Sequence, residues 1–231
     1  MKKSIIFALN TLGWLAVLLA LVMGCVRAVG ADPQLYHRLQ TKADILAYAG
    51  ISDQDLMDLD ARLADYLFAP MDADPAFDNR PLPVFGQSQP PFNAKELTHL
   101  ADCRKLLAPT ADLRLLAGLI AVGVALLLCG GRRGLRPGPL WLASSLILLP
   151  ITFLGLWAVM DFNAAFNFFH RIFFTNDLWL LDPDTDLLIR ICPSTMFAHM
   201  GLRIALQSAA ALLGLPLLLS AVSALQKRKR K

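Results

Sequence analysis

The sequence predicts an all-α membrane protein: a four-helix transmembrane bundle with a small, mainly helical extracytoplasmic cap and one short hairpin. The chain of 231 residues is 56% hydrophobic, which exceeds the apolar share of ordinary soluble domains. A helix that crosses a bilayer needs about 20 mostly apolar residues. Four windows meet or approach this length, at roughly 4–26, 113–129, 140–160 and 197–225.

The charges separate between the segments that join these windows. Basic residues without acidic neighbours lie at 2–3, 132–136 and 227–231, whereas every Asp and Glu lies within 30–112 or 161–196. Lys and Arg near span ends mark the cytoplasmic side. We therefore expect both termini inside and both acidic segments outside. The terminal basic run is interpreted as a topology anchor compatible with anionic lipid, and it does not indicate nucleic-acid binding.

This topology divides the chain into five parts. They are transmembrane helix 1 (1–29), an extracytoplasmic helical cap (30–112), transmembrane helices 2 and 3 with a short basic cytoplasmic loop (113–161), an aromatic extracytoplasmic segment (162–196), and transmembrane helix 4 with a basic tail (197–231). The first window also resembles a lipoprotein signal peptide ending at Cys25. The bulky Met23 and the long apolar run favour a retained span.

The cap contains helical spacing at 33–48 and 52–68, separated by Gly50. Ser52 and Asp55 have the spacing of an N-cap. Residues 69–92 are rich in Pro, Asp and Gly, which indicates an irregular loop that serves as a connector or as a mobile lid.

A third cap helix is predicted at 94–107. Asn93 and Glu96 have the spacing of a capping box, and Pro109 ends the helix.

In the second outer segment, the third span is expected to continue as a helix through 162–174. Residues 179–190 read as a small hairpin with Pro183 in its turn, and Pro193 and Ser194 open the fourth span. Cys103 and Cys192 both lie outside, so they are either free thiols, which is the default, or a pair.

Two histidines are candidates for acid–base chemistry. Glu96, His99 and Asp102 are spaced by three, so they share a helical face. A carboxylate beside a histidine fixes its tautomer and raises its basicity. The alternative is a solvated polar stripe. His170 lies within a Phe-rich run and is either an acid–base group for a lipid-like substrate or part of an interfacial aromatic belt.

Other chemistry is less well supported. The sequence has no G-x-S-x-G motif, no H-E-x-x-H motif and no Gly-rich phosphate loop, so it predicts neither a cofactor nor a metal. Two histidines with Asp102 are the weaker zinc alternative. His37 and His199 are weak candidates. Arg203, inside the fourth span, is expected to pair with Asp161, to reach toward the headgroups, or to hold a substrate carbonyl or headgroup.

Two motifs resemble those of the lipoprotein intramolecular transacylases, a family of four-span bacterial membrane proteins. The first comprises FHRIFF at 169–174, Trp179, Asp182-Pro, Asp186-x-Leu-Ile and Pro193 ahead of Phe197, and the second is Glu96-x-x-His99-x-x-Asp102. The chain departs from the second motif by Leu100, where Met is common, and by Cys103, where Val is expected.

The resemblance implies an enzyme at the outer face of the bacterial cytoplasmic membrane. It moves the sn-2 acyl chain of a diacylglyceryl lipoprotein to the α-amine of its N-terminal Cys, giving the lyso form. Its partners are that lipoprotein and membrane lipids. The implied residues are catalytic His99 and His170, supporting Glu96, Asp102 and Asp186, and substrate-binding Phe166, Phe169, Phe173, Trp179 and Arg203.

This chemistry needs no enzyme nucleophile, because the substrate carries both the attacking amine and the acyl donor. One histidine takes the proton of the amine, and the other donates to the leaving oxygen or stabilises the oxyanion. The sequence does not assign the two roles. Two other functions stay open: a non-enzymatic interaction protein whose acidic cap binds a partner, and a metal-dependent membrane hydrolase.

Overall fold

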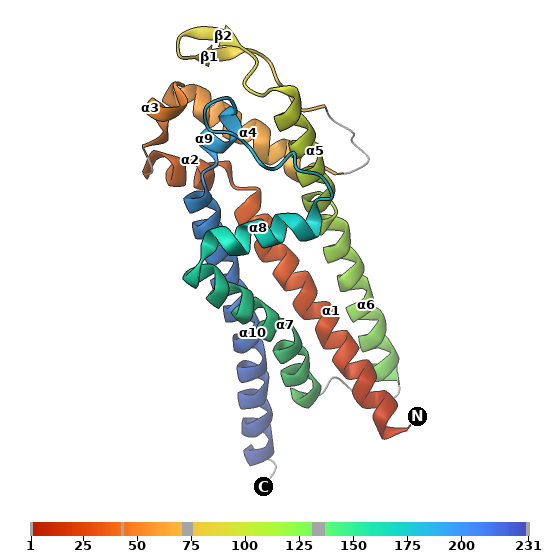
Figure 1. Ribbon diagram of the computed structural model, residues 1–231. Coiled ribbons are helices and arrows are strands. Elements are labelled where there is room, and N and C mark those ends of the chain that lie inside the picture. The colour runs from red at the N-terminus through yellow and green to blue at the C-terminus, as the bar shows by residue number, and fades with distance from the viewer. Residues whose placement is uncertain (1, 43, 71–75, 131–136, 230–231) are drawn as a thin grey trace. The chain divides into compact units, whose positions relative to one another are not determined.

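The computed structural model describes residues 2–42, 44–70, 76–130 and 137–229 (Figure 1). Its elements are α1 (Lys3–Gly30), α2 (Pro33–Lys42), α3 (Ile45–Ala49), α4 (Asp53–Phe68), β1 (Leu82–Val84), β2 (Gln87–Gln89), α5 (Ala94–Leu107), α6 (Thr110–Gly130), α7 (Pro137–Met160), α8 (Phe162–Phe173), α9 (Leu187–Ile191) and α10 (Ser194–Lys229).

The predicted all-α membrane class is confirmed. Within the described residues, four helical stretches are long and apolar enough to cross a membrane: Lys3–Gly30, Ala94–Cys129, Gly138–Met160 and Ser194–Gln226. The apolar part of the second stretch is α6, because α5 carries five charged side chains. α1 continues unbroken past Cys25. The basic loop residues at 132–136 lie outside the described residues.

The chain forms two compact units. The first comprises Met1–Val26, Ala111–Leu156 and Arg203–Lys231. Its core consists of apolar side chains from α1, α7 and α10, namely Trp14, Leu18, Val22, Leu140, Ala143 and Leu212. Many other apolar side chains of these helices point outward, Leu149 and Leu206 among them, as expected of a surface that faces lipid.

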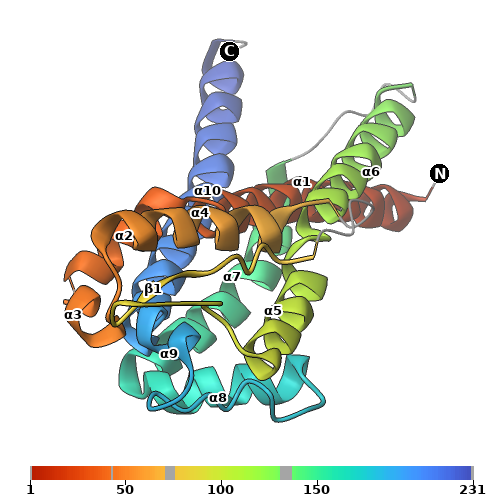
Figure 2. The same cartoon turned by 90° about the horizontal axis from the view of Figure 1, so that it is seen from above.

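The second unit comprises Arg27–Thr110 and Trp157–Leu202. α4 packs between α2 and α5, and α3 packs against α9 (Figure 2). The buried side chains of Leu56, Leu59 and Leu63 form one face of α4. The Oγ of Ser52 accepts a hydrogen bond from the N–H of Asp55 at 3.1 Å, so the predicted N-cap is confirmed.

The predicted helix at 33–48 is divided into α2 and α3. Asp44 adopts a left-handed conformation (φ 54°) just before α3. Gly50 ends α3 with φ 68°, and a Cβ there would meet the ring of Phe85 at 2.4 Å. A glycine is therefore required at this position both by the backbone and by the close approach of the ring.

The short hairpin lies elsewhere than predicted. β1 pairs with β2 within the stretch expected to be an irregular loop, with Val84 opposite Gln87. Phe85 and Gly86 have φ values of 49° and 77°, the positive values that a tight hairpin turn requires. The lid alternative for this stretch falls partly on residues 71–75, outside the described residues.

The predicted hairpin at 179–190 is wrong. The expected turn is present, since the N–H of Thr185 donates to the carbonyl of Asp182 at 3.1 Å. The chain then enters α9 instead of a second strand, because Glu96 Oε1 accepts from the N–H of Leu188 in the first turn of α9. A buried carboxylate at a helix N-terminus favours the helix.

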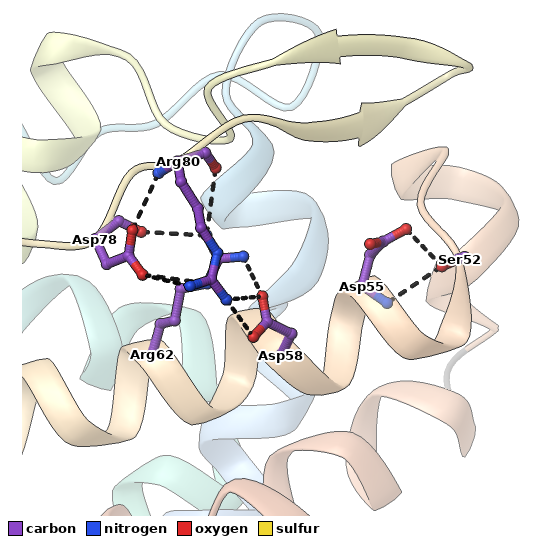
Figure 3. Close-up of polar contacts among 6 residues, drawn as sticks. All are labelled: Ser52, Asp55, Asp58, Arg62, Asp78 and Arg80. Atoms are coloured by element: carbon purple, nitrogen blue, oxygen red, sulfur yellow. Dashed lines mark hydrogen bonds and ion pairs between the residues drawn. The ribbon is translucent and has the colours of Figure 1, made fainter.

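An ion network holds the segment before β1 on α4 (Figure 3). Asp58 accepts from Arg62 and from Arg80, and Arg80 pairs with Asp78 at 3.1 Å. Arg62 also donates to the backbone carbonyls of residues 78 and 80. Exposed ion pairs contribute about 0–1 kcal/mol each, so the network chiefly fixes where this segment lies.

The third span does not continue into the aromatic segment. α7 ends at Met160, and Asp161 is extended with φ −150° and ψ 92°. Its Oδ1 accepts a hydrogen bond from the N–H of Ala164 at 2.9 Å, so Asp161 is the N-cap of a separate helix, α8. The expected continuous helix is therefore interrupted, because the extended backbone of Asp161 ends α7 and its side chain caps α8.

A buried polar cluster joins α2, α4 and the end of α9. Nε2 of Gln40 donates to Oδ1 of Asp60 at 2.8 Å and to the carbonyl of Ile191 at 2.9 Å. Gln40 and Asp60 are both 0% exposed. Burial raises the pKa of Asp60 to about 7, against the opposing effect of the Gln40 bond. The cluster therefore prefers an uncharged carboxyl.

This preference predicts that Asp60→Asn stabilises the protein at alkaline pH. Because the folded pKa of Asp60 is raised, its stabilisation is complete below about pH 4 and is lost as pH rises through about 7. An amide cannot ionise and keeps the acceptor for Gln40. Thermal unfolding in detergent should give a Tm higher than wild type by at least about 3 °C at pH 8.

The exposed Asp65 on the same helix is the matched control, and Asp65→Asn should change the Tm little at either pH. At pH 5 the advantage of Asp60→Asn should shrink, because wild-type Asp60 is then largely protonated. A Tm difference that is the same at pH 5 and pH 8 contradicts this account of the cluster.

Candidate active site

The second unit brings two buried histidines together. His99 of α5 and His170 of α8 are each 7% exposed. Their ring centroids lie 6.0 Å apart with an interplanar angle of 35°. At this separation both rings can contact one small group bound beside them. The two residues are 71 positions apart in the sequence, so the fold and not local spacing pairs them.

The N-terminus of α5 fixes the position of His99. Asn93 Oδ1 accepts from the N–H of Glu96 at 3.0 Å, and Glu96 Oε2 accepts from the N–H of Asn93 at 2.8 Å. This is the predicted capping box. The other oxygen of Glu96 accepts from Leu188 at 2.7 Å. The carboxylate thus joins α5 to α9 one turn before His99.

Aromatic side chains enclose the pair. The ring of Phe174 lies 5.2 Å from His99 and 5.4 Å from His170. Trp179 lies 4.9 Å from His170, and Phe166 lies 4.1 Å from it. Phe174 and Trp179 are each only 8% exposed. Low-dielectric surroundings of this kind disfavour charged imidazoles and strengthen polar interactions within the site.

The tautomer of His170 follows from its backbone contact. Its Nδ1 lies 2.7 Å from the carbonyl oxygen of Phe166, one turn earlier in α8. A carbonyl oxygen only accepts hydrogen bonds, so Nδ1 carries the hydrogen and the neutral ring has a lone pair on Nε2. Burial lowers the pKa of His170, and the bond to Phe166 opposes that change. His170 is therefore a neutral proton acceptor near pH 7.

His99 is the less basic ring. Burial, and then the neighbouring His170, lower its pKa to about 4, against a smaller raising effect of Asp102. His99 is neutral at physiological pH, and a neutral imidazole carries one N–H donor. The adjacent Cys103 Sγ lies 3.5 Å from Nε2. Burial raises the pKa of Cys103 to about 12, so it lacks the thiolate character of a nucleophilic cysteine.

The expected carboxylate partners of His99 have other contacts. Asp102 accepts from Lys105 Nζ and from Asn176 Nδ2, each at 2.9 Å. The oxygens of Glu96 accept from backbone N–H groups. The expectation that a carboxylate sets the tautomer of His99 is therefore wrong. Asp186 accepts from Asn93 Nδ2 at 2.8 Å and from Asp182 N–H at 2.8 Å, and thereby holds the loop before α9.

The predicted substrate-binding residues fall into two groups. Phe166 and Trp179 contact His170 directly. Phe169 and Phe173 are 42% and 50% exposed, and their rings pack together at 4.6 Å with a tilt of 44°. Since the ring of Phe169 also lies 5.6 Å from His170, this leaves an aromatic surface beside the pair. Arg203 is exposed and belongs to the other compact unit, so its assignment stays a prediction.

Two residues of the site were not found from the sequence. Phe174 touches both imidazoles, and Asn176 bonds Asp102 across 74 positions of the chain. Phe174 is the last residue of the FHRIFF run, and membership of that run was the one feature of the sequence that pointed to it. A pocket of about 220 Å³ lies beside the pair and is lined by Asp102, Lys105, Leu106, Phe173, Phe174, Thr175 and Asn176.

The other two histidines have different partners. His37 Nε2 lies 3.2 Å from Asp53 Oδ1, and His199 Nδ1 lies 2.7 Å from the carbonyl of Thr195. All four cysteines are free thiols. In the part of the chain that the structure describes, no three His, Cys, Asp or Glu side chains are placed as metal ligands.

The comparisons with known proteins point to one family. The family profile described as lipoprotein intramolecular transacylase Lit matches residues 11–197. Among solved structures, the membrane-integral lipoprotein intramolecular transacylase Lit from Bacillus cereus is similar, with a TM-score of 0.79 and 21% identity over 99% of each chain. No curated protein sequence matches the chain.

Two variants of the same Bacillus cereus protein, in which a histidine is replaced by arginine or alanine, are also similar. The arginine variant has a TM-score of 0.76 and 20% identity over 99% of this chain and 96% of its own. The alanine variant has a TM-score of 0.74 and 21% identity over 98% of this chain and 96% of its own. At these identities the likeness shows a shared fold.

Proposed function

The chain belongs to the lipoprotein intramolecular transacylase family, and from this premise we propose its reaction in detail. It moves the sn-2 acyl chain of a diacylglyceryl lipoprotein from the glycerol oxygen to the α-amine of the N-terminal cysteine of the same molecule. The product is the lyso form. The observation that carries this proposal is the pair of buried, neutral imidazoles 6.0 Å apart in an aromatic enclosure.

The reaction exchanges one ester for one amide. The neutral amine attacks the ester carbonyl, and His170 Nε2 takes the proton that the nitrogen loses. The tetrahedral intermediate then collapses, the carbonyl carbon–oxygen bond to glycerol breaks, and the protonated His170 returns the proton to the leaving oxygen. The substrate supplies every heavy atom that changes bonds. Catalysis therefore requires no covalent acyl-enzyme.

The pKa directions support a division of labour between the rings. A proton acceptor works best with a pKa near the operating pH. His99, with a pKa of about 4, is a poor base but a good neutral N–H donor. We assign His170 as the general base and acid, and His99 as the donor to the oxyanion. Proton transfer contributes about 10²–10⁴-fold, and one oxyanion donor about 10²–10³-fold.

Substrate positioning supplies the rest of the rate enhancement. Holding amine and ester in one reactive pose is worth up to about 7–11 kcal/mol in well-oriented systems. The exposed rings of Phe169 and Phe173 offer apolar surface to acyl chains beside the pair. We propose that this surface opens to the outer leaflet, with both termini of the chain in the cytoplasm, because the basic stretches lie at the termini and in the loop at 132–136.

Analysis of the lipoprotein N-terminus tests the function. Transfer within one molecule is an isomerisation, so the intact mass of the lipopeptide does not change. Expression in a host without other lipoprotein N-acylation should give lipopeptides whose α-amine resists amine-reactive labelling and whose tandem mass spectra show the acyl group on the cysteine nitrogen. Lipopeptides that keep a free amine and two ester-linked chains contradict the proposal.

A further inference from the structure

We propose that Asp102 and Asn176 form a latch that holds the segment 174–179 closed over the two imidazoles. This inference rests on the proposed function, because it makes both residues positioning residues for transacylation. The latch is the hydrogen bond from Asn176 Nδ2 to Asp102 Oδ2, at 2.9 Å. It assigns to Asp102 a role other than the orientation of His99.

The latch acts on the segment that covers the site. The segment has no regular secondary structure, yet it contributes both Phe174 and Trp179, whose rings contact the imidazoles. Asn176 Oδ1 accepts from the N–H of Leu178 at 3.0 Å, so the side chain of Asn176 connects α5 to the backbone just before Trp179. Movement of Asn176 therefore moves the ring that covers His170.

The ends of the segment are fixed by other groups. The N–H of Phe174 donates to the carbonyl of His170 at 2.8 Å, and Lys95 Nζ donates to the carbonyl of Leu180 at 2.6 Å. Between these points, and among the residues that the structure describes, the bond between Asp102 and Asn176 joins the segment to α5. Without it, the segment can bow outward between fixed ends, which admits water to the pair.

The charge state of Asp102 suits an acceptor. The bond from Lys105 lowers its pKa, and the bond from Asn176 lowers it further, against the effect of burial. Asp102 also raises the pKa of His99 slightly through space. A loss of activity on changing Asp102 alone therefore has two explanations, its charge and its hydrogen bond, and the test must separate them.

An exchange of the two side chains separates charge from hydrogen bonding. Asn176→Asp sets two carboxylates against each other and breaks the latch. Combining it with Asp102→Asn restores one donor and one acceptor at the original total charge. We expect Asn176→Asp to lower kcat/KM, chiefly through kcat, by about 10- to 100-fold. The exchanged pair should recover to within about threefold of wild type.

Two further variants sharpen the test. Asp102→Asn alone removes the charge but keeps a carbonyl acceptor for Asn176, so its activity should stay close to that of the exchanged pair. Asn79→Asp is the control for added charge. Like Asn176, Asn79 lies in the second unit and its side chain is hydrogen-bonded, in this case to the backbone of Phe92. It should leave the rate unchanged. A loss in Asp102→Asn as large as that in Asn176→Asp shows that the charge matters and overturns the latch.

Hydrogen exchange gives a readout that does not depend on catalysis. The amides of residues 174–181 should exchange faster in Asn176→Asp and slow again in the exchanged pair. The inference is overturned if Asn176→Asp shows wild-type catalytic rates and wild-type hydrogen exchange. It is also overturned if the double variant Asp102→Asn/Asn176→Asp stays as impaired as Asn176→Asp. If the wild-type protein makes no lyso product, the proposed function fails, while hydrogen exchange still decides the latch.

Discussion

His170→Gln should lose transacylation by about 10²–10⁴-fold, the usual value of a general base. The substitution keeps a polar side chain of similar length but removes the basic Nε2. In the wild type, Nδ1 bonds the carbonyl of Phe166, so Nε2 is the nitrogen that accepts the proton, and glutamine has no nitrogen of comparable basicity. The initial rate of lyso-form appearance with a diacylglyceryl lipopeptide in detergent measures the loss.

The chain offers a closely matched control for this variant. His199 makes the same contact as His170, from Nδ1 to the carbonyl four residues earlier, at the same 2.7 Å. It lies at the exposed start of α10. His199→Gln should retain the wild-type rate. Equal rates for His170→Gln and wild type, with correct membrane insertion of both, contradict the assignment of the base.

His99→Phe should lower kcat by about 10²–10³-fold, the effect expected for loss of one oxyanion donor. Phenylalanine keeps the aromatic packing against Phe174 but has no N–H. The residual activity should keep the pH dependence of the wild type, because His99, with a pKa of about 4, is not the group that takes the proton. A pH–rate profile of kcat measures both effects.

A second variant beside His99 tests for a covalent route. Cys103 contacts the imidazole, so a cysteine nucleophile activated by His99 is the competing mechanism. The raised pKa of the thiol speaks against it. Cys103→Ala should keep the rate within about threefold of wild type. Complete loss in Cys103→Ala, or a pH optimum displaced in His99→Phe, refutes the role given to His99.

The sequence predicted the features that depend on local chemistry. The caps at Ser52 and Asn93 use side chains that bond the backbone three residues on, so spacing alone reveals them. The spans depend on long apolar composition, which is equally visible. Asp161 caps α8 by the same short-range rule. Its position at the end of an apolar span is equally compatible with an ion pair to Arg203, so spacing alone does not single out the cap.

The partners of buried polar groups could not be predicted in this way. Asp102 has His99 on its own helical face, yet its carboxylate bonds Asn176 from a segment 74 residues away. Glu96 likewise accepts a hydrogen bond from the first turn of α9, where a hairpin strand was expected. The donors that a buried carboxylate bonds are set by tertiary packing. The spacing of residues within one helix does not predict those donors. The predicted topology placed both imidazoles outside and near span ends, and the family resemblance paired them, but their contact depends on packing.

A crossover experiment with two labelled substrates tests the central claim most directly. One lipopeptide carries deuterated acyl chains on an unlabelled peptide, and the other carries unlabelled chains on an isotopically heavy peptide. With the purified wild-type protein, every lyso product should pair its nitrogen-linked chain with the peptide that originally bore it, and His170→Gln should give almost no product. Products that pair deuterated chains with heavy peptide would show that the acyl group leaves its own molecule, and would contradict the account.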